Sequence, residues 1–572
     1  MVFPIIRTAA AVALAVSLTL PTVVQSDTGA GSYLAGRQAI YDSDFAASAR
    51  YYTQALIRDP KNPGLMENVI LSQLALGQVE RALPVAQSLE ALGLGSQMAS
   101  MAVVANLITD EAYDALLSRI EGEQAVSMLV DGLLVGWAHM GAGSVGKALA
   151  QFDKLGDEAG LRGFALYHKA MALASVGDFE GANAIFTGED GQQATLTRRA
   201  VLANVEILSQ LGRNDEALEM LSDVFAGRLD PGLTKVTDQL TKGETLPFSQ
   251  VRSVRDGMAE VFFSIGAALS GEASDDYALI YSRMAGYLRP DHNDALLLSA
   301  SLLENLGQYE LSVDTYKSIP EDNPDHFAAE LGRAEALRRS AKPDAAIEVL
   351  EQLTREYPEL PAVHSALGDL LRQQEEYAPA VIAYDKALEF TDEKAANRWF
   401  ILYARGISHE RLKQWPEAEA DFRTALELEP DQPQVLNYLG YSLVEKQEKL
   451  DEALSMIERA VAARPDSGYI VDSLGWVLFR LGRYVEAVDH MERAVELMPI
   501  DPVVNDHLGD VYWAVGRTRE AEFQWSRALS FIDPEDADSE ADPDRIRRKL
   551  DVGLDEVLAE EGAAPLQVAN DG

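Results

Sequence analysis

Apolar residues recur three and four positions apart along most of the chain, which is the spacing that places them on one face of an α-helix. These stretches come in pairs, each about a dozen residues long, and a short turn such as LGRY, Leu481 to Tyr484, joins the two members. The glycine of such a turn can take the left-handed conformation that ends a helix. The pattern therefore predicts an all-α chain built from antiparallel helix pairs.

The pairs repeat with a regular period, which is marked by a small residue in the first helix. The markers are Gly266, Ala300, Ala334, Gly368, Gly406, Gly440, Gly475 and Gly509. Most steps between them are about 34 residues, and two steps are slightly longer. Ala487, Ala494 and Pro499 follow the marker Gly475 at +12, +19 and +24, and several other periods keep these offsets. Proline ends the second helix because it lacks a backbone N–H. The small residues let the helices approach closely, and we expect each marker to face the alanine at +12.

This pattern resembles the tetratricopeptide repeat family. The resemblance is specific from Trp399 to Asp533, holds from Ala259 onward, and is weaker toward the N-terminus. It implies a right-handed α-solenoid with a concave groove. A single helix pair cannot bury its own apolar face, so the units are expected to stack on one another.

The period also suggests how the chain is divided. Degenerate repeats are expected over 27–224, where the period persists but the proline is lost. The stretch 225–258 has glycine and proline punctuation and no clean repeat, so we interpret it as an irregular joint and leave open that the solenoid has two halves. Eight repeats are expected over 259–535. An acidic linker and a capping helix should cover the last open face over 536–562, and 563–572 are expected to form a disordered tail.

The stretch GAGSVGKA, Gly141 to Ala148, fits the phosphate-binding P-loop G-x-x-x-x-G-K-[ST] except at its last position. A P-loop follows a β-strand, whereas the preceding WAHM continues a helical pattern. Gly136 is the marker of a unit, and Ala148 is the alanine at +12 from it. We therefore interpret the stretch as the turn between two helices, and a nucleotide-binding enzyme is the disfavoured alternative.

Composition narrows the chemistry further. The net charge of −42 argues against nucleic acid as a partner and against docking on anionic lipid, because both attract basic segments. The chain has no cysteine, which excludes disulfides, thiolate metal sites and a thiol nucleophile. His409 and Glu410 begin an H-E-x-x-H motif, but Lys413 stands at its decisive position. Asp536, Asp538 and Glu540 have calcium-loop spacing, but the required glycine and bidentate acid are absent. We expect no metal, no cofactor and no catalytic residue.

The N-terminus has the form of a secretory signal. Arg7 precedes the apolar stretch Thr8 to Leu20, whose 13 residues are too few to span a bilayer comfortably. Val24 and Ser26 offer small residues before a cleavage point at Asp27. Residues 1–26 are therefore expected to be removed on export, which leaves no stable membrane insertion. An uncleaved anchor and a buried first helix are the alternatives.

One face of the first helices carries the best candidate site. Residues at −6, −3, +1 and +4 from the marker share a stripe on the helix, and in the tetratricopeptide family that stripe lines the concave groove. In the last four units the stripe is aromatic with acids interleaved. The expected peptide-groove residues are Tyr403, Asn437, Tyr441, Tyr469, Asp472, Trp476, Phe479, Asp506, Asp510 and Trp513.

Aromatic rings beside hydrogen-bonding groups suit an extended peptide, and acids next to rings favour lysine or arginine side chains. The alternative is that the rings pack between neighbouring helices. The sequence thus predicts a non-enzymatic adaptor that binds a protein or peptide of basic or apolar character. The resemblance to exported bacterial tetratricopeptide proteins places it in the periplasm or peripheral to the cell envelope. A self-associating structural protein, and hence a homo-oligomer, is the alternative.

Overall fold

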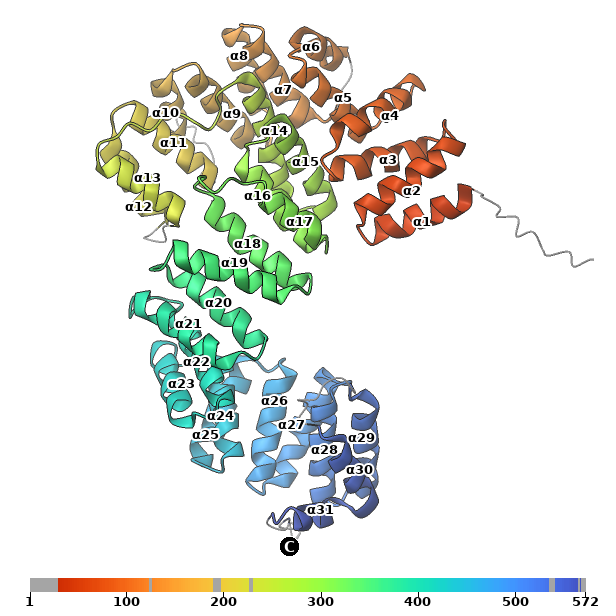
Figure 1. Ribbon diagram of the computed structural model, residues 1–572, viewed down its shortest axis with the longest axis vertical. Helices are drawn as coiled ribbons and strands as arrows, with labels where there is room; N and C mark the ends of the chain where they lie inside the picture. Colours follow the sequence, from red (N-terminus) through yellow and green to blue (C-terminus); the bar gives the residue numbers. More distant parts are fainter. Residues whose placement is uncertain are drawn as a thin grey trace, which may run out of the picture. The chain divides into compact units, whose positions relative to one another are not determined.

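The computed structural model describes residues 29–122, 126–188, 197–225, 230–533, 541–563 and 566, and within these ranges every regular element is a helix (Figure 1). The expected signal peptide, 1–26, and most of the expected acidic linker and tail lie outside the described residues. None of the described helices is long and apolar enough to cross a membrane. The all-α prediction is confirmed.

The helices come in antiparallel pairs that follow one another along the chain. Six pairs precede residue 226: α1 (Gly29–Tyr41) and α2 (Phe45–Arg58), α3 (Pro63–Ala75) and α4 (Val79–Ala91), α5 (Gln97–Thr109) and α6 (Tyr113–Gly122), α7 (Met128–Gly141) and α8 (Val145–Gly156), α9 (Arg162–Ser175) and α10 (Phe179–Thr187), α11 (Arg198–Gln210) and α12 (Asn214–Phe225). A single helix follows, α13 (Pro231–Thr241). Residues 242–253 then run without a helix.

Seven further pairs follow up to residue 531. They are α14 (Val254–Leu269) and α15 (Asp275–Leu288), α16 (Asn293–Asn305) and α17 (Tyr309–Tyr316), α20 (Pro361–Gln373) and α21 (Tyr377–Phe390), α22 (Arg398–Arg411) and α23 (Trp415–Leu428), α24 (Pro433–Glu445) and α25 (Leu450–Ala463), α26 (Gly468–Arg480) and α27 (Tyr484–Leu497), α28 (Pro502–Ala514) and α29 (Thr518–Phe531). Helices α18 (His326–Arg339) and α19 (Pro343–Glu356) stand between α17 and α20 in chain order. Two short helices follow in the described residues, α30 (Pro543–Val552) and α31 (Leu554–Glu560).

The marker glycines are small because the second helix of the pair crosses directly over them. A Cβ atom on Gly406 would lie 2.7 Å from the Phe422 ring, and one on Gly509 would lie 2.4 Å from the Trp525 ring. Both rings stand at +16 from their markers. In these pairs the atoms nearest to the glycine therefore belong to the side chain at +16, one turn beyond the alanine at +12, and the alanines Ala418 and Ala521 are fully buried in the same second helices.

The P-loop-like stretch is the turn between α7 and α8. Helix α7 ends at Gly141, and Gly143 takes the left-handed conformation with a φ of 70°. Ala148 lies fully buried in α8. No strand precedes the stretch in the described residues, which run unbroken from 126 through it. The structure therefore lacks the strand-to-helix context that a P-loop requires.

The contacts divide the chain into two compact units, residues 1–341 and 342–572. The expected joint, 225–258, lies inside the first unit; its residues 226–229 are outside the described ranges. The division itself falls between α18 and α19, inside the block of repeats expected over 259–535.

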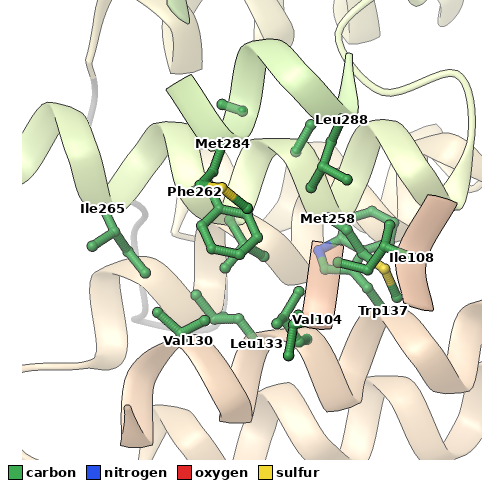
Figure 2. Packing of buried hydrophobic residues seen from close by; sticks show 14 of the residues in the cluster. Val104, Ile108, Val130, Leu133, Trp137, Met258, Phe262, Ile265, Met284 and Leu288 are labelled. Atoms are coloured by element: carbon green, nitrogen blue, oxygen red, sulfur yellow. The ribbon is translucent and has the colours of Figure 1, made fainter. Parts of the chain in front are cut away.

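In the first unit the helices after the joint pack onto the helices before it. Helix α14 contacts α5, α7 and α9, and α15 contacts α3 and α5, so the first helices of the earlier pairs surround this later pair (Figure 1). Figure 2 shows the shared core, in which Trp137 and Leu133 of α7 meet Met258 and Phe262 of α14. A Cβ atom on Gly257 would lie 2.4 Å from the Trp137 ring, so the contact leaves no room for a side chain there.

Candidate binding groove

A groove of about 360 Å³ opens on the first helices of successive pairs in the second unit. Its walls come from α22, α24 and α26, and the start of α28 closes one end. The lining residues are Glu410, Arg411, Asn437, Tyr438, Tyr441, Ser442, Glu445, Lys446, Tyr469, Asp472, Ser473, Met498, Asp501, Val503 and Val504. Four of the residues expected from the sequence stripe are among them: Asn437, Tyr441, Tyr469 and Asp472.

Helix α24 provides the central wall of the groove. Pro433 at its first turn fits a position where the backbone N–H has no partner in any case. Asn437 follows on the inner stripe and is 8% exposed, and its Oδ1 atom is buried without a hydrogen-bond partner in the described residues. Leaving a buried acceptor unpaired costs free energy. A ligand N–H would remove that cost if the Asn437 side chain turned its oxygen toward the groove.

Tyrosine rings form one side of the groove. The ring of Tyr438 makes an edge contact with that of Tyr403, with 5.9 Å between centroids, and its hydroxyl donates to Glu410 at 3.4 Å. Burial raises the pKa of Tyr403 to about 12, so the phenol stays neutral. Tyr403 thus stands behind the groove rather than in its lining. Tyr469 is 49% exposed and offers its ring to a ligand.

The acids of the groove are partly compensated. Glu445 accepts a hydrogen bond from the Trp476 Nε1 atom at 2.9 Å and lies 3.7 Å from Arg480. Glu410 lies 3.9 Å from Arg411, which is more exposed than the acid. Since exposed ion pairs are weak, the groove keeps an acidic character that favours a cationic group.

Two expected groove aromatics are packing residues instead. Trp476 is 9% exposed and Phe479 is 8% exposed, and their rings stack with 4.9 Å between centroids. The imidazole of His507, from α28, stacks on the other side of the indole. His507 also bonds Asp472, with 3.1 Å between Nδ1 and Oδ2. These contacts join α26 to α28. In this part of the stripe the aromatic rings therefore pack between neighbouring helices, which is the alternative to a peptide-binding role.

The last three expected residues lie against the C-terminal helices. Lys549 of α30 is completely buried and donates to Asp506 at 2.8 Å and to Asp510 at 2.6 Å. Trp513 donates from Nε1 to Asp555 at 2.9 Å. Helix α30 covers the end of the array. Its Lys549 contacts the stripe residues Asp506 and Asp510 of α28, just as His507 of α28 contacts the stripe residue Asp472 of α26. The chain itself thus occupies this end of the stripe.

The stripe rule missed several lining residues, among them Tyr438, Glu445 and Lys446. They stand at −2, +5 and +6 from the marker Gly440, on the flank of the expected stripe. The width of the groove explains the omission, because three neighbouring helices open a face broader than one line of side chains. No group of described His, Asp or Glu residues has the arrangement of a metal site.

Models of the tetratricopeptide repeat match residues 33–96, 294–326, 331–396, 403–467 and 444–502. A TPR repeat-containing protein of Pseudomonas aeruginosa is 28% identical over 178 residues, and a protein O-mannosyl-transferase of Homo sapiens is 27% identical over 202 residues. These matches cover 31% and 32% of this chain but only 29% and 21% of the relatives. Among solved structures, the Cut9–Hcn1 hetero-tetramer of the APC/C aligns with 92% of this chain and 96% of its own, with 13% identity and a TM-score of 0.38.

Proposed function

Because the chain belongs to the tetratricopeptide repeat family, whose stacked helix pairs form surfaces for binding other proteins, we propose that it is a non-enzymatic scaffold that holds a partner segment in the groove of α22, α24 and α26. The observation that carries this proposal is the unpaired Oδ1 of Asn437 beside the rings of Tyr438, Tyr441 and Tyr469. An extended backbone would supply the missing N–H donor, while the rings bury its side chains.

The acids of the groove favour lysine or arginine in that segment. Glu410, Glu445 and Asp472 line a surface whose cations are Arg411 and Lys446. Lys446 is held over the Trp415 ring, 4.8 Å from its centroid, which keeps it at the rim. We infer a partner of basic or apolar character from this lining. Electrostatic attraction of this kind raises association rates and selects partners more than it adds affinity.

The N-terminal sequence supports a proposal for the compartment in which the protein acts. Residues 1–26 have the form of an export signal, and a chain without cysteine folds in an oxidising compartment without forming disulfides. We therefore propose the periplasm and a role in assembling the cell envelope. Mass spectrometry of the purified native protein would test the first step: a mature N-terminus near Asp27 supports export, and an intact Met1 contradicts it.

Crosslinked co-purification from living cells tests the groove. The bait is the full chain, run beside an Asn437→Ala/Tyr441→Ala variant and a control, Phe523→Ala. Phe523 is 62% exposed on α29 and lies outside the groove lining. A partner held by the wild type and the control but lost from the double variant supports the proposal, provided that the melting temperatures agree. The same captured proteins in all three samples would move the site elsewhere.

Self-association is the second candidate. Four large apolar side chains are exposed on the first helix pair: Tyr33, Leu34, Tyr41 and Ile57, at 44%, 60%, 84% and 76%. Exposed apolar side chains can mark a protein–protein contact where they adjoin one another. Size-exclusion chromatography with light scattering decides between the candidates, because a monomer at all accessible concentrations contradicts self-association and leaves the groove proposal intact.

A further inference from the structure

The first unit contains a cavity of about 550 Å³ between α9 and α14, near the start of α11. Small residues create the space: Gly160, Gly163, Ala267 and Ala268 line it. Well-packed interiors leave few voids larger than a water molecule, whereas ligand pockets measure roughly 300–1,000 Å³. The cavity therefore has the size of a binding pocket. The helix pair α14–α15 packs against the earlier first helices, and the described residues leave this space next to α9 unfilled.

The polar groups at the floor of the cavity already have hydrogen-bond partners. Glu260 is fully buried and accepts from the Tyr167 hydroxyl at 2.8 Å and from the Arg199 Nε atom at 2.8 Å. His292 lies 3.1 Å from the same carboxylate. Burial would raise the pKa of Glu260, but Arg199 and His292 hold it well below its usual range. These polar groups already have partners. The apolar part of the lining is formed by the rings of Phe164 and Phe263, which suit an apolar group, although the Phe263 ring also contacts Arg199 and His292.

A second, polar cavity of about 300 Å³ adjoins the first across three shared residues: Arg198, Arg199 and Asp294. The arginines are compensated, because Arg199 also donates to Asp294 at 2.5 Å and Arg198 pairs with Asp230. Asp325 lines this cavity without an ion pair to any described residue. Burial and the neighbouring Asp294 raise the pKa of Asp325 to about 6, although Arg198 opposes the shift.

Asn293 lines the same cavity. Its side chain hydrogen-bonds the Asp325 carboxylate, but its own Oδ1 atom is buried without a hydrogen-bond partner in the described part of the chain. The Asp325 carboxylate and the Asn293 Oδ1 atom are both acceptors that a further hydrogen-bond donor would stabilise. An ammonium or guanidinium group would satisfy them together, because each carries several N–H donors and a positive charge.

We propose that the first unit carries a second binding site, in which a partner segment places a bulky apolar side chain in the larger cavity and a neighbouring lysine or arginine side chain in the smaller one. This site is separate from the groove of α22, α24 and α26 and does not depend on it. The shared wall of Arg198, Arg199 and Asp294 places the two subsites next to each other, so two adjacent residues of one segment can fill both.

The absence of cysteine allows a direct test. An Ala268→Cys variant of the full chain carries a single thiol at the exposed rim of the larger cavity, and its rate of labelling by N-ethylmaleimide reports occupancy there alone. The probe is a capped tetrapeptide, alanine-tryptophan-lysine-alanine. Labelling should slow about threefold when the peptide concentration reaches twice its Kd. Peptides with alanine in place of tryptophan, or glutamate in place of lysine, should protect the thiol much less.

Two variants test the cation subsite in this background. Asp325→Asn should weaken protection by the tryptophan-lysine peptide, whereas Asp322→Asn, an exposed acid on the same segment, should leave it unchanged. Equal protection by all three peptides, or no protection at all, overturns the proposal. So does a thiol that labels only after denaturation, because the chain itself would then fill the cavity. The Asn437→Ala/Tyr441→Ala change should not alter labelling, which separates this site from the groove.

Discussion

The imidazole of His507 lies parallel to the indole of Trp476, with 4.0 Å between ring centroids and 11° between ring planes. His507 belongs to α28 and Trp476 to α26, so the stack joins the first helices of two successive pairs. The Nδ1 atom of His507 also forms a hydrogen bond with the carboxylate of Asp472, which lies on α26. Because Asp472 also lines the groove, this packing contact supports the wall on which a ligand would lie.

Replacing Trp476 with alanine should mainly lower stability. The indole is buried between Phe479 and His507 and donates to Glu445, so truncation should cost roughly 3–5 kcal/mol in the free energy of unfolding. Urea unfolding of the variant measures this loss. The control is Tyr469→Ala, since Tyr469 is 49% exposed and its removal should cost well under about 1 kcal/mol. Equal losses in the two variants would show that Trp476 is not a packing residue.

The stability of the second unit should fall as the pH rises above neutrality. Burial alone would lower the pKa of His507, but Asp472, with further contributions from Asp506 and Asp510, raises it above 6.5. The stabilisation is therefore complete below pH 6.5 and is lost as the pH passes the folded pKa. The neutral imidazole can still donate from Nδ1 to Asp472, so the decline measures the loss of the positive charge and not of the whole hydrogen bond. Unfolding followed from pH 6 to pH 9 should show this decline in the wild type, and His507→Gln should flatten it.

Local pattern was enough to predict the helix pairs and the turn at Gly141–Ala148, because periodicity, glycine and proline act through neighbouring residues. It could not predict that α14–α15 would pack against α3, α5, α7 and α9, since those contacts join residues far apart in the sequence and depend on the path of the joint.

The groove stripe shows a second limit of prediction from local pattern. Trp476 and Tyr441 occupy the same register of successive units, yet only Tyr441 lines the groove, because a histidine and a phenylalanine happen to enclose the tryptophan.

Adding a methyl group at the marker Gly406 should destabilise the α22–α23 pair. The new Cβ atom would lie 2.7 Å from the Phe422 ring, and the ring is fully buried, so it has little room to move. Gly406→Ala should cost roughly 1–3 kcal/mol, the range for overpacked cores. Phe422→Leu costs stability by itself, but the double variant should lose less than the sum of the two single variants. Additive losses in a double-mutant cycle would contradict the contact.

Removing the buried charge of Lys549 should detach the C-terminal helices. Lys549→Met leaves Asp506 without its cation and Asp510 with only Arg545, at 3.8 Å, and breaking a buried pair in this way costs roughly 3–5 kcal/mol. Adding Asp506→Asn and Asp510→Asn to the variant should recover much of the loss, because no uncompensated charge remains. Hydrogen exchange in α30 is the measurement, and Lys386→Met, at an exposed ion pair, is the control. Unchanged protection in Lys549→Met would show that apolar packing alone holds the cap.

The first unit should respond to pH in the opposite direction from His507. His168 is completely buried, its Nδ1 atom accepts from Trp137 at 3.1 Å, and its Nε2 atom lies 3.1 Å from the Ser264 hydroxyl. Burial lowers the pKa of His168 to about 4, although the nearby Glu260 opposes the shift. Between pH 6.5 and 4, His168 is therefore protonated in the unfolded chain but neutral in the folded chain.

Acidification from pH 6.5 to 4 should accordingly cost the first unit roughly 3 kcal/mol of unfolding free energy. Hydrogen exchange resolved by segment is the measurement, because it reads α7, α9 and α14 separately from the second unit. His168→Gln can keep both hydrogen bonds without titrating, so its losses over this range should be smaller than those of the wild type. Equal slopes for the two proteins would assign the acid sensitivity to other groups, with His292 first, since burial and Arg199 lower its pKa below 6.5 as well.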